Sequence, residues 1–178
     1  MVNAKNPLIK VPFRYGLLGG AIGSLVIAVL YFIGRHPFLL PVIFDFRVIL
    51  FGVFIFFSLK ELRDYNLQGV LFFWQGMISS YVFIITSALI GSLFTWGFAK
   101  WYTQFLSSYI EKLREQMTAY KNEIITSVGT EAYNEQWKKL PFTSPMDLAG
   151  DYFLKSMIIG LFLAIIMSVI LRKQPKTN

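Results

Sequence analysis

The residues from Val70 to Phe98 constrain this chain most, because they include no charged side chain and only one strongly polar one, Gln75. A run this long and apolar is typical of a helix that crosses a lipid bilayer. Beyond Lys100 the run gives way to apolar residues spaced by three and four, which is the pattern of an amphipathic helix. The sequence therefore predicts one continuous helix that leaves the bilayer and extends into water as far as Val128.

Three further apolar segments complete a predicted membrane domain. Hydrophobic residues make up 55% of the 178 residues and aromatic residues 17%, more than soluble domains contain. We expect an all-α polytopic membrane protein, a single domain over residues 1–178, with four transmembrane helices and a long extramembrane helical hairpin between helices 3 and 4. The predicted transmembrane helices are residues 13–33, 42–59, 70–100 and 150–171, and the hairpin is residues 101–144.

The predicted hairpin turns at Gly129, where the amphipathic helix ends, and continues as a short second helix that Thr130 caps and Pro141 ends. Its apolar and aromatic side chains form a candidate surface for a partner protein or for the membrane. Alternatively, these side chains pack against one another within a self-contained loop. The candidate surface residues are Phe105, Tyr109, Leu113, Met117, Tyr120, Tyr133 and Trp137.

Small residues recur at every fourth position in the first and fourth predicted spans. Such ladders are typical of helix packing in membranes, because small side chains let two backbones approach closely. We expect the first and fourth spans to pack together, or each of them to face another subunit. The predicted helix-packing residues are Gly16, Gly20 and Ser24 in the first span and Gly160, Ala164 and Ser168 in the fourth.

Two charged residues, Asp45 and Arg47, lie near the start of the second span. We expect both at the membrane interface, where the positive end of the helix dipole favours Asp45. A deeper position for them indicates a functional site, namely a polar cleft that holds a lipid headgroup or an ion. The single histidine, His36, is predicted to be a turn residue at the interface. The candidate cleft residues are Asp45, Arg47, Gln75, Asp151 and Lys155.

The net charge of +7 comes mostly from basic residues near the chain ends and in the turn between the second and third spans. This distribution follows the positive-inside rule, so it indicates membrane topology rather than nucleic-acid binding. We expect a bacterial inner-membrane protein with cytoplasmic N and C termini, and an outer face formed by residues from Trp101 to about Asp151. The basic residues on the terminal side are Lys5, Lys10, Arg14, Lys60, Arg63, Arg172, Lys173 and Lys176, opposed by Glu61 and Asp64.

The sequence lacks the motifs of common catalytic sites. It has no cysteine and one histidine, which excludes thiolate and histidine-cluster metal sites. It contains no zincin motif, phosphate-binding loop, dinucleotide-binding glycine motif or nucleophile elbow. We therefore expect no enzyme activity and no catalytic, cofactor-binding or metal-binding residues. An intramembrane hydrolase or transferase is the least supported alternative, because no nucleophile can be paired with a base by spacing.

Several short motifs carry a resemblance to a known family. The turn after the second span reads KELRD over residues 60–64, and it is followed by Gly69 and by FFWQG over residues 72–76. The first span contains YGLLGG over residues 15–20, and the last span ends with LRK over residues 171–173. In these motifs the chain resembles the small four-helix membrane proteins of Bacteroidota that are classified as a domain of unknown function. The resemblance implies an inner-membrane location and a long outer helical loop between spans three and four, and it implies no activity and no catalytic residue.

We therefore expect a non-catalytic inner-membrane protein that acts as a subunit or accessory scaffold of a larger membrane complex, with the outer hairpin docking a partner. The expected partners are other membrane protein subunits or further copies of the chain, together with phospholipid and without nucleic acid. The alternative is a small lipid-handling or transport protein with a polar intramembrane cleft. For that alternative the resemblance suggests a link to lipid-linked glycan metabolism, which no residue shows. No cofactor is expected in either case.

Overall fold

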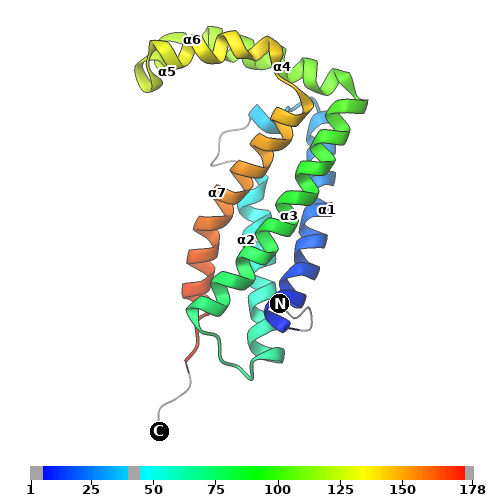
Figure 1. Cartoon of the computed structure of the whole chain (residues 1–178), viewed down its shortest axis with the longest axis vertical. Helices are drawn as coiled ribbons and strands as arrows, with labels where there is room; N and C mark the ends of the chain where they lie inside the picture. Colours follow the sequence, from blue (N-terminus) through cyan, green and yellow to red (C-terminus); the bar gives the residue numbers. More distant parts are fainter. Residues whose placement is uncertain (1–5, 40–44, 175–178) are drawn as a thin grey trace.

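Four long helices lie side by side and form a bundle in the computed structural model (Figure 1). The structure describes residues 6–39 and 45–174, so the predicted start of the second span at residue 42 lies outside the described residues. The predicted all-helical class is confirmed, and within the described ranges the one pairing of extended backbone is a bridge between Leu71 and Lys173. The bundle helices are α1 (Pro7–Phe32), α2 (Phe46–Glu61), α3 (Phe73–Trp101) and α7 (Pro145–Leu171).

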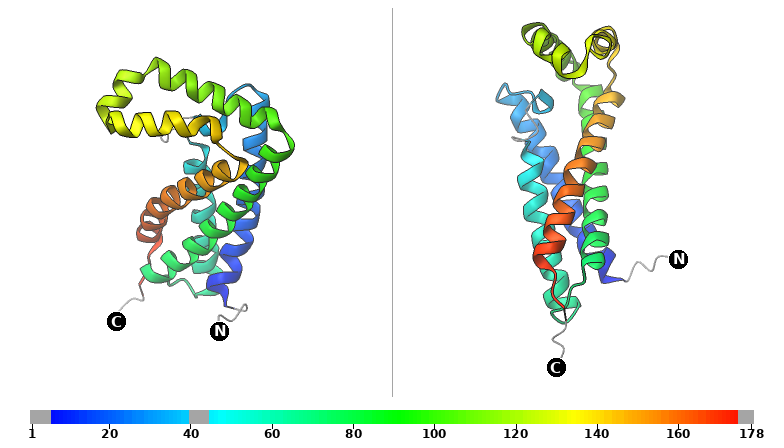
Figure 2. Two further views of the ribbon diagram at one scale, coloured as in Figure 1. Left: turned by 45° about the horizontal axis from the view of Figure 1, so that its top comes forward. Right: turned by 90° about the vertical axis from the view of Figure 1, so that its left-hand side faces the viewer.

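Three shorter helices cross one end of the bundle and extend sideways past α7 (Figure 2). We call residues 103–142 the arm. α1 begins and α7 ends at the opposite end of the bundle, which we call the terminal end (Figure 1). The arm helices are α4 (Thr103–Ala119), α5 (Lys121–Val128) and α6 (Thr130–Lys139), and the short turns are η1 (Pro37–Leu39) after α1, η3 (Leu62–Asn66) after α2 and η4 (Leu140–Phe142) after α6.

Three of the bundle helices, α1, α3 and α7, are each long and apolar enough to cross a membrane. Their outer faces expose large apolar side chains, among them Leu25, Leu93 and Phe162, each more than 60% exposed. Exposed apolar surface on this scale is unfavourable in water and suits contact with lipid. These features are those of a membrane protein.

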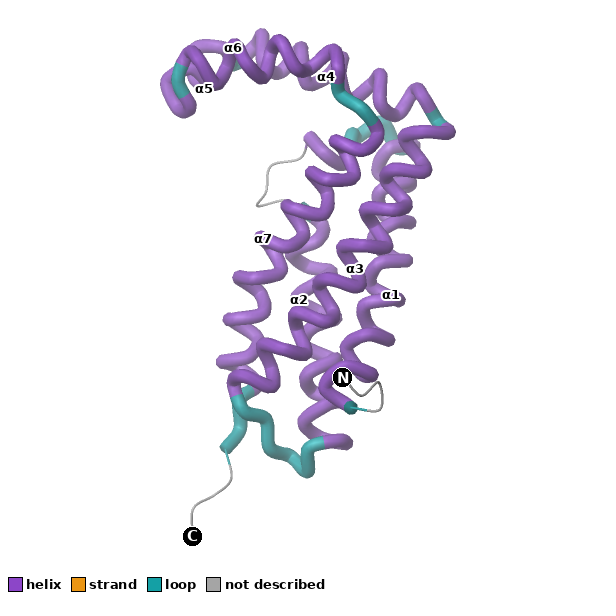
Figure 3. Tube along the Cα trace, in the orientation of Figure 1, coloured by secondary structure: helices purple, strands orange, loops and turns teal. Residues whose placement is uncertain are grey.

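The predicted continuous helix from Val70 to Val128 is wrong, because the chain leaves helical geometry at two points (Figure 3). Tyr102 has φ −110° and ψ 82°, and Tyr120 has φ −105° and ψ 24°. The break at Tyr102 turns α4 across the end of the bundle, where Phe105 becomes completely buried. A straight continuation would carry this side chain away from the bundle, so burial of Phe105 favours the break.

Local capping explains how α7 begins. The hydroxyl of Ser144 accepts a hydrogen bond from the backbone N–H of Asp147 at 3.3 Å, and the carboxylate of Asp147 accepts one from the N–H of Ser144 at 2.7 Å. Pro145 occupies the first helical position, where its missing N–H costs nothing. Thr130 was predicted to cap the second helix of the hairpin. In the structure Gly129, with φ 90°, directly precedes α6, and Thr130 is its first helical residue.

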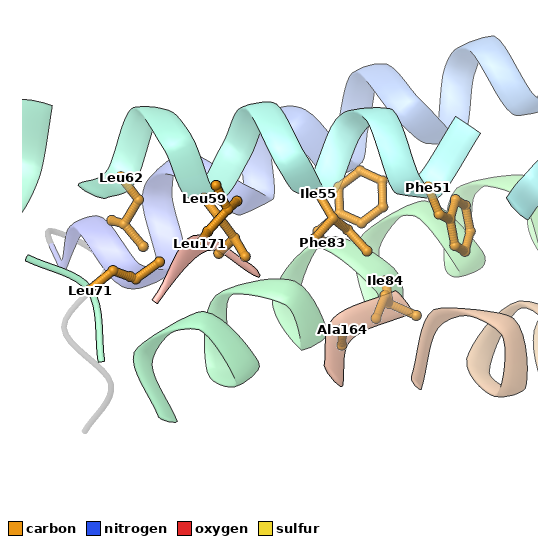
Figure 4. Packing of buried hydrophobic residues seen from close by; sticks show 9 residues of the cluster. All are labelled: Phe51, Ile55, Leu59, Leu62, Leu71, Phe83, Ile84, Ala164 and Leu171. Atoms are coloured by element: carbon orange, nitrogen blue, oxygen red, sulfur yellow. The ribbon is translucent and has the colours of Figure 1, made fainter. Parts of the chain in front are cut away.

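The core of the bundle lies between α2, α3 and α7. Figure 4 shows side chains from these three helices and the adjoining turns in contact with one another. Since lipid is as apolar as these side chains, close van der Waals packing holds the helices together here, rather than the removal of apolar surface from water. The buried cluster consists of Phe51, Ile55, Leu59, Leu62, Leu71, Phe83, Ile84, Ala164 and Leu171.

Residues of both predicted small-residue ladders pack against α3 and not against each other. A Cβ atom on Gly20 of α1 would lie 2.7 Å from the Cβ of Ile90, and one on Gly160 of α7 would lie 2.6 Å from Cγ2 of Ile84. Ser168 of α7 approaches Gly76 of α3 in the same way. The expectation that the first and fourth spans pack together is therefore wrong, because α3 uses both ladders.

Candidate functional site

Asp45 and Arg47 form an ion pair that is buried at the start of α2. The guanidinium Nε of Arg47 donates to Asp45 Oδ1 at 2.8 Å, and its Nη2 donates to Asp45 Oδ2. Nη1 donates to the backbone oxygen of Tyr152 at 3.0 Å and to Ser156 Oγ at 3.1 Å, both on α7. The side chains of Arg47 and Asp45 are only 4% and 8% exposed.

The sequence did not predict that the protein encloses this pair, and the predicted position of both charges at the depth of the membrane interface stays a prediction. Asp45 also caps α2, because its Oδ1 accepts a hydrogen bond from the backbone N–H of Arg47 at 2.9 Å. Every nitrogen of the guanidinium group donates to an acceptor, and these bonds use four of its five N–H groups. The pair therefore works as a clamp between α2 and α7, and removal of one partner would leave an uncompensated buried charge.

His36 lies in the turn after α1 and is buried beneath α4. Its ring stacks on Phe105 with ring centroids 4.7 Å apart, and its Nε2 lies 3.2 Å from the backbone oxygen of Phe105. Tyr31, Phe38 and Tyr109 surround the ring. Burial among these aromatic side chains lowers the pKa of His36 from 6.5 to about 4. The position in a turn was predicted, whereas the burial of the ring beneath α4 was not.

A cavity lies where the arm joins α7, and its volume is about 390 Å³. Leu113 and Met117 of α4, Leu140 of η4 and Leu148 of α7 form its apolar wall. We call this space the arm cavity. Its polar lining residues include Tyr109, Gln136, Lys139, Thr143, Asp147 and Asp151.

The acidic side of the arm cavity comes from the first turns of α7. Asp147 and Asp151 are four positions apart, so they lie on the same face of the helix. Asp151 forms an ion pair with Lys155 at 2.7 Å, with both side chains more than one-third exposed. Burial, together with the nearby Asp151 carboxylate, raises the pKa of Tyr109 to about 12, so its hydroxyl remains a neutral donor.

Lys139 supplies the positive charge on the opposite side of the arm cavity. Its ammonium lies 3.6 Å from the carboxylate of Glu135 and is 81% exposed. A pair this exposed and this long is weak, because water screens it. The arm cavity thus combines two carboxylates from α7, one ammonium from α6 and the apolar wall described above.

The five residues of the predicted polar cleft do not line one site. The side chain of Gln75 accepts a hydrogen bond from the N–H of Phe72 at 3.0 Å and caps α3 near the terminal end. Asp45 and Arg47 are enclosed in the clamp between α2 and α7. Only Asp151 lines the arm cavity, with Lys155 as its ion-pair partner. The predicted grouping is therefore wrong, because these residues belong to three separate places.

The predicted surface stripe on the arm is also divided. Met117 and Tyr133 are buried with Leu140 in a small core within the arm, where the hydroxyl of Tyr133 donates to the backbone oxygen of Met117 at 3.2 Å. These two residues and Phe105 do not form an exposed surface, which favours the self-packed alternative for them. Two predicted residues are half-buried, Tyr109 and Leu113, and two are exposed, Tyr120 and Trp137.

Sequence reasoning missed Lys139 and Asp147 as cavity residues. Lys139 is the last residue of α6, and Asp147 belongs to the capping box of α7. Nothing in their spacing indicates that the two would line one cavity, because that depends on how α6 returns to α7. In the part of the chain that the structure describes, no three histidine or acidic side chains come together as a metal site.

Comparison with curated proteins and with solved structures gave no match. A family model does match, and it covers residues 14–173, which include most of α1, the other bundle helices, the arm and both polar sites described above. A match over this length identifies the family, and the family description assigns no activity. The chain belongs to the family described as "Protein of unknown function (DUF4199)".

Proposed function

We propose that this protein is a non-catalytic accessory subunit of a membrane complex and that α2 is a fourth membrane span. α2 has 16 residues and continues directly into η3, which adds 5. At about 1.5 Å per residue the two together reach about 30 Å, the thickness of the hydrocarbon core. With four spans, both chain ends lie on one side of the membrane and the arm lies on the other as an extramembrane hairpin.

The proposed orientation places the terminal end in the cytoplasm, with the arm on the outer side of a bacterial inner membrane. At the terminal end, Lys60 lies in the last turn of α2 and Arg63 lies in η3, and Arg172 and Lys173 follow α7 there. The positive-inside rule favours a cytoplasmic location for such a cluster. Lys5 and Lys176, which belong to the same prediction, lie outside the described residues.

One observation carries the proposed role: the arm is a preformed projection with its own core. Met117, Tyr133 and Leu140 are buried within it, so it keeps its shape without a partner. It extends sideways beyond α7 (Figure 1) and exposes Tyr120 and Trp137, which are 55% and 38% exposed. Aromatic side chains of this kind are enriched at protein interfaces. We therefore assign these two residues to contact with another membrane subunit.

Gentle extraction followed by native mass measurement tests this role. The expected result is one defined complex that contains this chain and a second membrane protein or further copies. Replacing both exposed residues in Y120S/W137S should release the chain from that complex, whereas Y65S, a change of an exposed tyrosine at the terminal end, should not. A clean monomer from wild-type membranes, with nothing bound, contradicts the proposal.

Lipid handling is a second candidate function, and the arm cavity favours it. The cavity lies where the arm joins the first turns of α7. Phe142 lines it and is 84% exposed, and Met146, which precedes the lining residue Asp147, is 70% exposed. Exposed apolar side chains beside a half-polar cavity suit an amphiphile with its headgroup in the cavity. For this second candidate function, the polar site is the arm cavity and not the cleft that the sequence predicted.

A further inference from the structure

We infer that the arm cavity binds the headgroup of an aminophospholipid, with a primary ammonium held by Asp147 and Asp151 and a phosphate held by Lys139. This assignment rests on the lipid-handling candidate and names its ligand class. Its basis is the distribution of charge around a cavity of about 390 Å³, with two carboxylates on the α7 wall and a lysine on the α6 wall. A zwitterionic headgroup presents the complementary pair of charges.

The ammonium side of the site follows from the hydrogen bonds of the two carboxylates. Oδ2 of Asp147 accepts from both the N–H and the hydroxyl of Ser144, each at 2.7 Å, while no described residue donates to its Oδ1. Among the described residues, Asp151 pairs with Lys155 at 2.7 Å. Each carboxylate therefore retains acceptor capacity, and a primary ammonium has three donors to fill it. Tyr109 adds an aromatic ring to the same space, which also favours a cation.

The phosphate side of the site is Lys139, at the end of α6. Its carboxylate neighbour Glu135 is 3.6 Å away and exposed, so a phosphate can replace that weak contact. Gln136 and Thr143 line the same side and offer neutral polar groups. A charge-assisted hydrogen bond from an ammonium to phosphate is stronger than the neutral ones around it.

The chemistry also predicts which headgroups are excluded. A phosphatidylglycerol headgroup has no cation to place against Asp147 and Asp151, so its negative charge is repelled there. A choline headgroup carries a cation but has no N–H to donate to the carboxylates. The expected order of binding is therefore ethanolamine first, then choline, then glycerol.

A path for the acyl chains runs down the same face of α7. Leu154 and Ile158 follow Asp151 at spacings of three and seven, so they continue its helical face away from the arm. Both are exposed, at 63% and 59%, and both lie within a helix that is apolar enough to cross a membrane. A lipid with its headgroup in the arm cavity can thus lie with its acyl chains against α7.

Native mass spectrometry of the full chain, loaded with phosphatidylethanolamine, phosphatidylcholine or phosphatidylglycerol in mixed micelles, tests the assignment. We expect one retained lipid, with phosphatidylethanolamine retained best. D151N should weaken its retention about tenfold, because one charged hydrogen-bond partner is lost. E131Q, the matched control, removes a charge from an exposed position of α6 outside the arm cavity and should leave retention unchanged. Thermal unfolding checks that both variants are folded.

Two further measurements distinguish a membrane lipid from a soluble ligand, and they distinguish failure of the headgroup assignment from failure of the lipid-handling candidate. L113W adds bulk to the apolar wall without changing charge and should abolish retention of every lipid. Free phosphoethanolamine should displace the lipid only at high concentration, because it lacks acyl chains; displacement at low concentration would assign the site to a soluble ligand instead. Equal retention by D151N and E131Q, or no preference among headgroups, overturns the aminophospholipid assignment alone. Retention of no lipid at all overturns the lipid-handling candidate as well.

Discussion

The guanidinium carbon of Arg47 lies 4.7 Å from the ring centroid of Tyr152, and the same arginine donates to the backbone oxygen of Tyr152 at 3.0 Å. One residue of α2 therefore holds both the side chain and the main chain of one residue of α7. Cation–π contacts of this kind strengthen when water is excluded. With Asp45 as the counter-charge, the contact fixes how α7 enters the bundle, and with it the place where the arm returns.

Replacing Arg47 with methionine should destabilise the chain by about 3 to 5 kcal/mol, because Asp45 would remain buried without its partner. The double variant D45N/R47M should lose less stability than R47M, since it leaves no unpaired charge. Denaturant unfolding in detergent measures both. The control is R63M at the terminal end, which removes a partly exposed ion pair with Asp64 and should change the free energy of unfolding little. Equal losses in the single and double variants would show that the burial of charge is not the cause.

Stability should fall in acid through His36. Its pKa is about 4 in the folded chain and 6.5 in the unfolded chain, so the stabilisation is complete above pH 6.5 and is lost as the pH falls toward 4. The loss reaches about 3 kcal/mol at most, because one pKa unit corresponds to about 1.4 kcal/mol. The groups that face the ring are Tyr31, Tyr109 and the ammonium of Lys112, which also donates to the backbone oxygen of Gly34 at 2.9 Å.

Unfolding midpoints at pH 7.5 and pH 4.5 measure this effect. H36F keeps an aromatic ring in the same place and cannot be protonated, so its midpoint should change less between the two pH values. Carboxylates elsewhere titrate equally in both proteins and cancel in the comparison. The same pH dependence in H36F and in the wild type would assign the acid effect to other groups.

Gly91 of α3 should not tolerate a methyl group. A Cβ atom there would overlap the ring of Tyr152, which is 2% exposed and has no room to move. Overpacking of a buried site costs about 1 to 3 kcal/mol, and G91A should lose that amount in thermal unfolding. G150A is the control, since a Cβ at Gly150 has no atom within 4 Å and alanine favours helix. G91A/Y152L should regain part of the loss, and failure to do so would contradict the proposed clash.

Truncation of Tyr133 should loosen the arm and leave the bundle intact. Y133A removes a side chain from the arm core together with its hydrogen bond to the backbone oxygen of Met117. We expect a loss of about 3 kcal/mol of local stability, as for other buried aromatic residues. Hydrogen exchange should therefore accelerate in α5 and α6 but not in α3. The control, Y120A, changes an exposed tyrosine and should leave exchange unchanged; acceleration throughout the chain would mean that the arm does not fold as a separate unit.

The absence of cysteine from the sequence makes sidedness directly measurable. Y120C on the arm and Y65C at the terminal end each introduce one thiol at an exposed position, 55% and 86% exposed in the parent residue. A membrane-impermeant maleimide should label Y120C in intact spheroplasts and should label Y65C only after lysis. The reverse pattern would place the arm in the cytosol and remove the proposed orientation.

Local patterns in the sequence predicted much of the secondary structure. The predicted third span, residues 70–100, corresponds closely to α3 (Phe73–Trp101), because hydropathy is a property of the segment itself. The start of α7 is marked in the sequence by Ser144, Pro145 and Asp147, since a capping box involves residues three positions apart. The small-residue ladders were identified as packing surfaces by their spacing. Their partner was not identified, because a ladder shows that a helix packs closely but does not show which helix it packs against.

The sequence by itself determined that the chain is helical, that it carries helices fit for a membrane, and where several of those helices begin. Only the tertiary structure decided that the helix breaks at Tyr102, that Asp45 and Arg47 are buried, and that Lys139 and Asp147 line one cavity. Helix formation and hydropathy depend on neighbours within a few positions. Burial depends on residues far apart in the chain, such as Arg47 and Ser156 or His36 and Phe105, whose contacts exist only after the helices have packed.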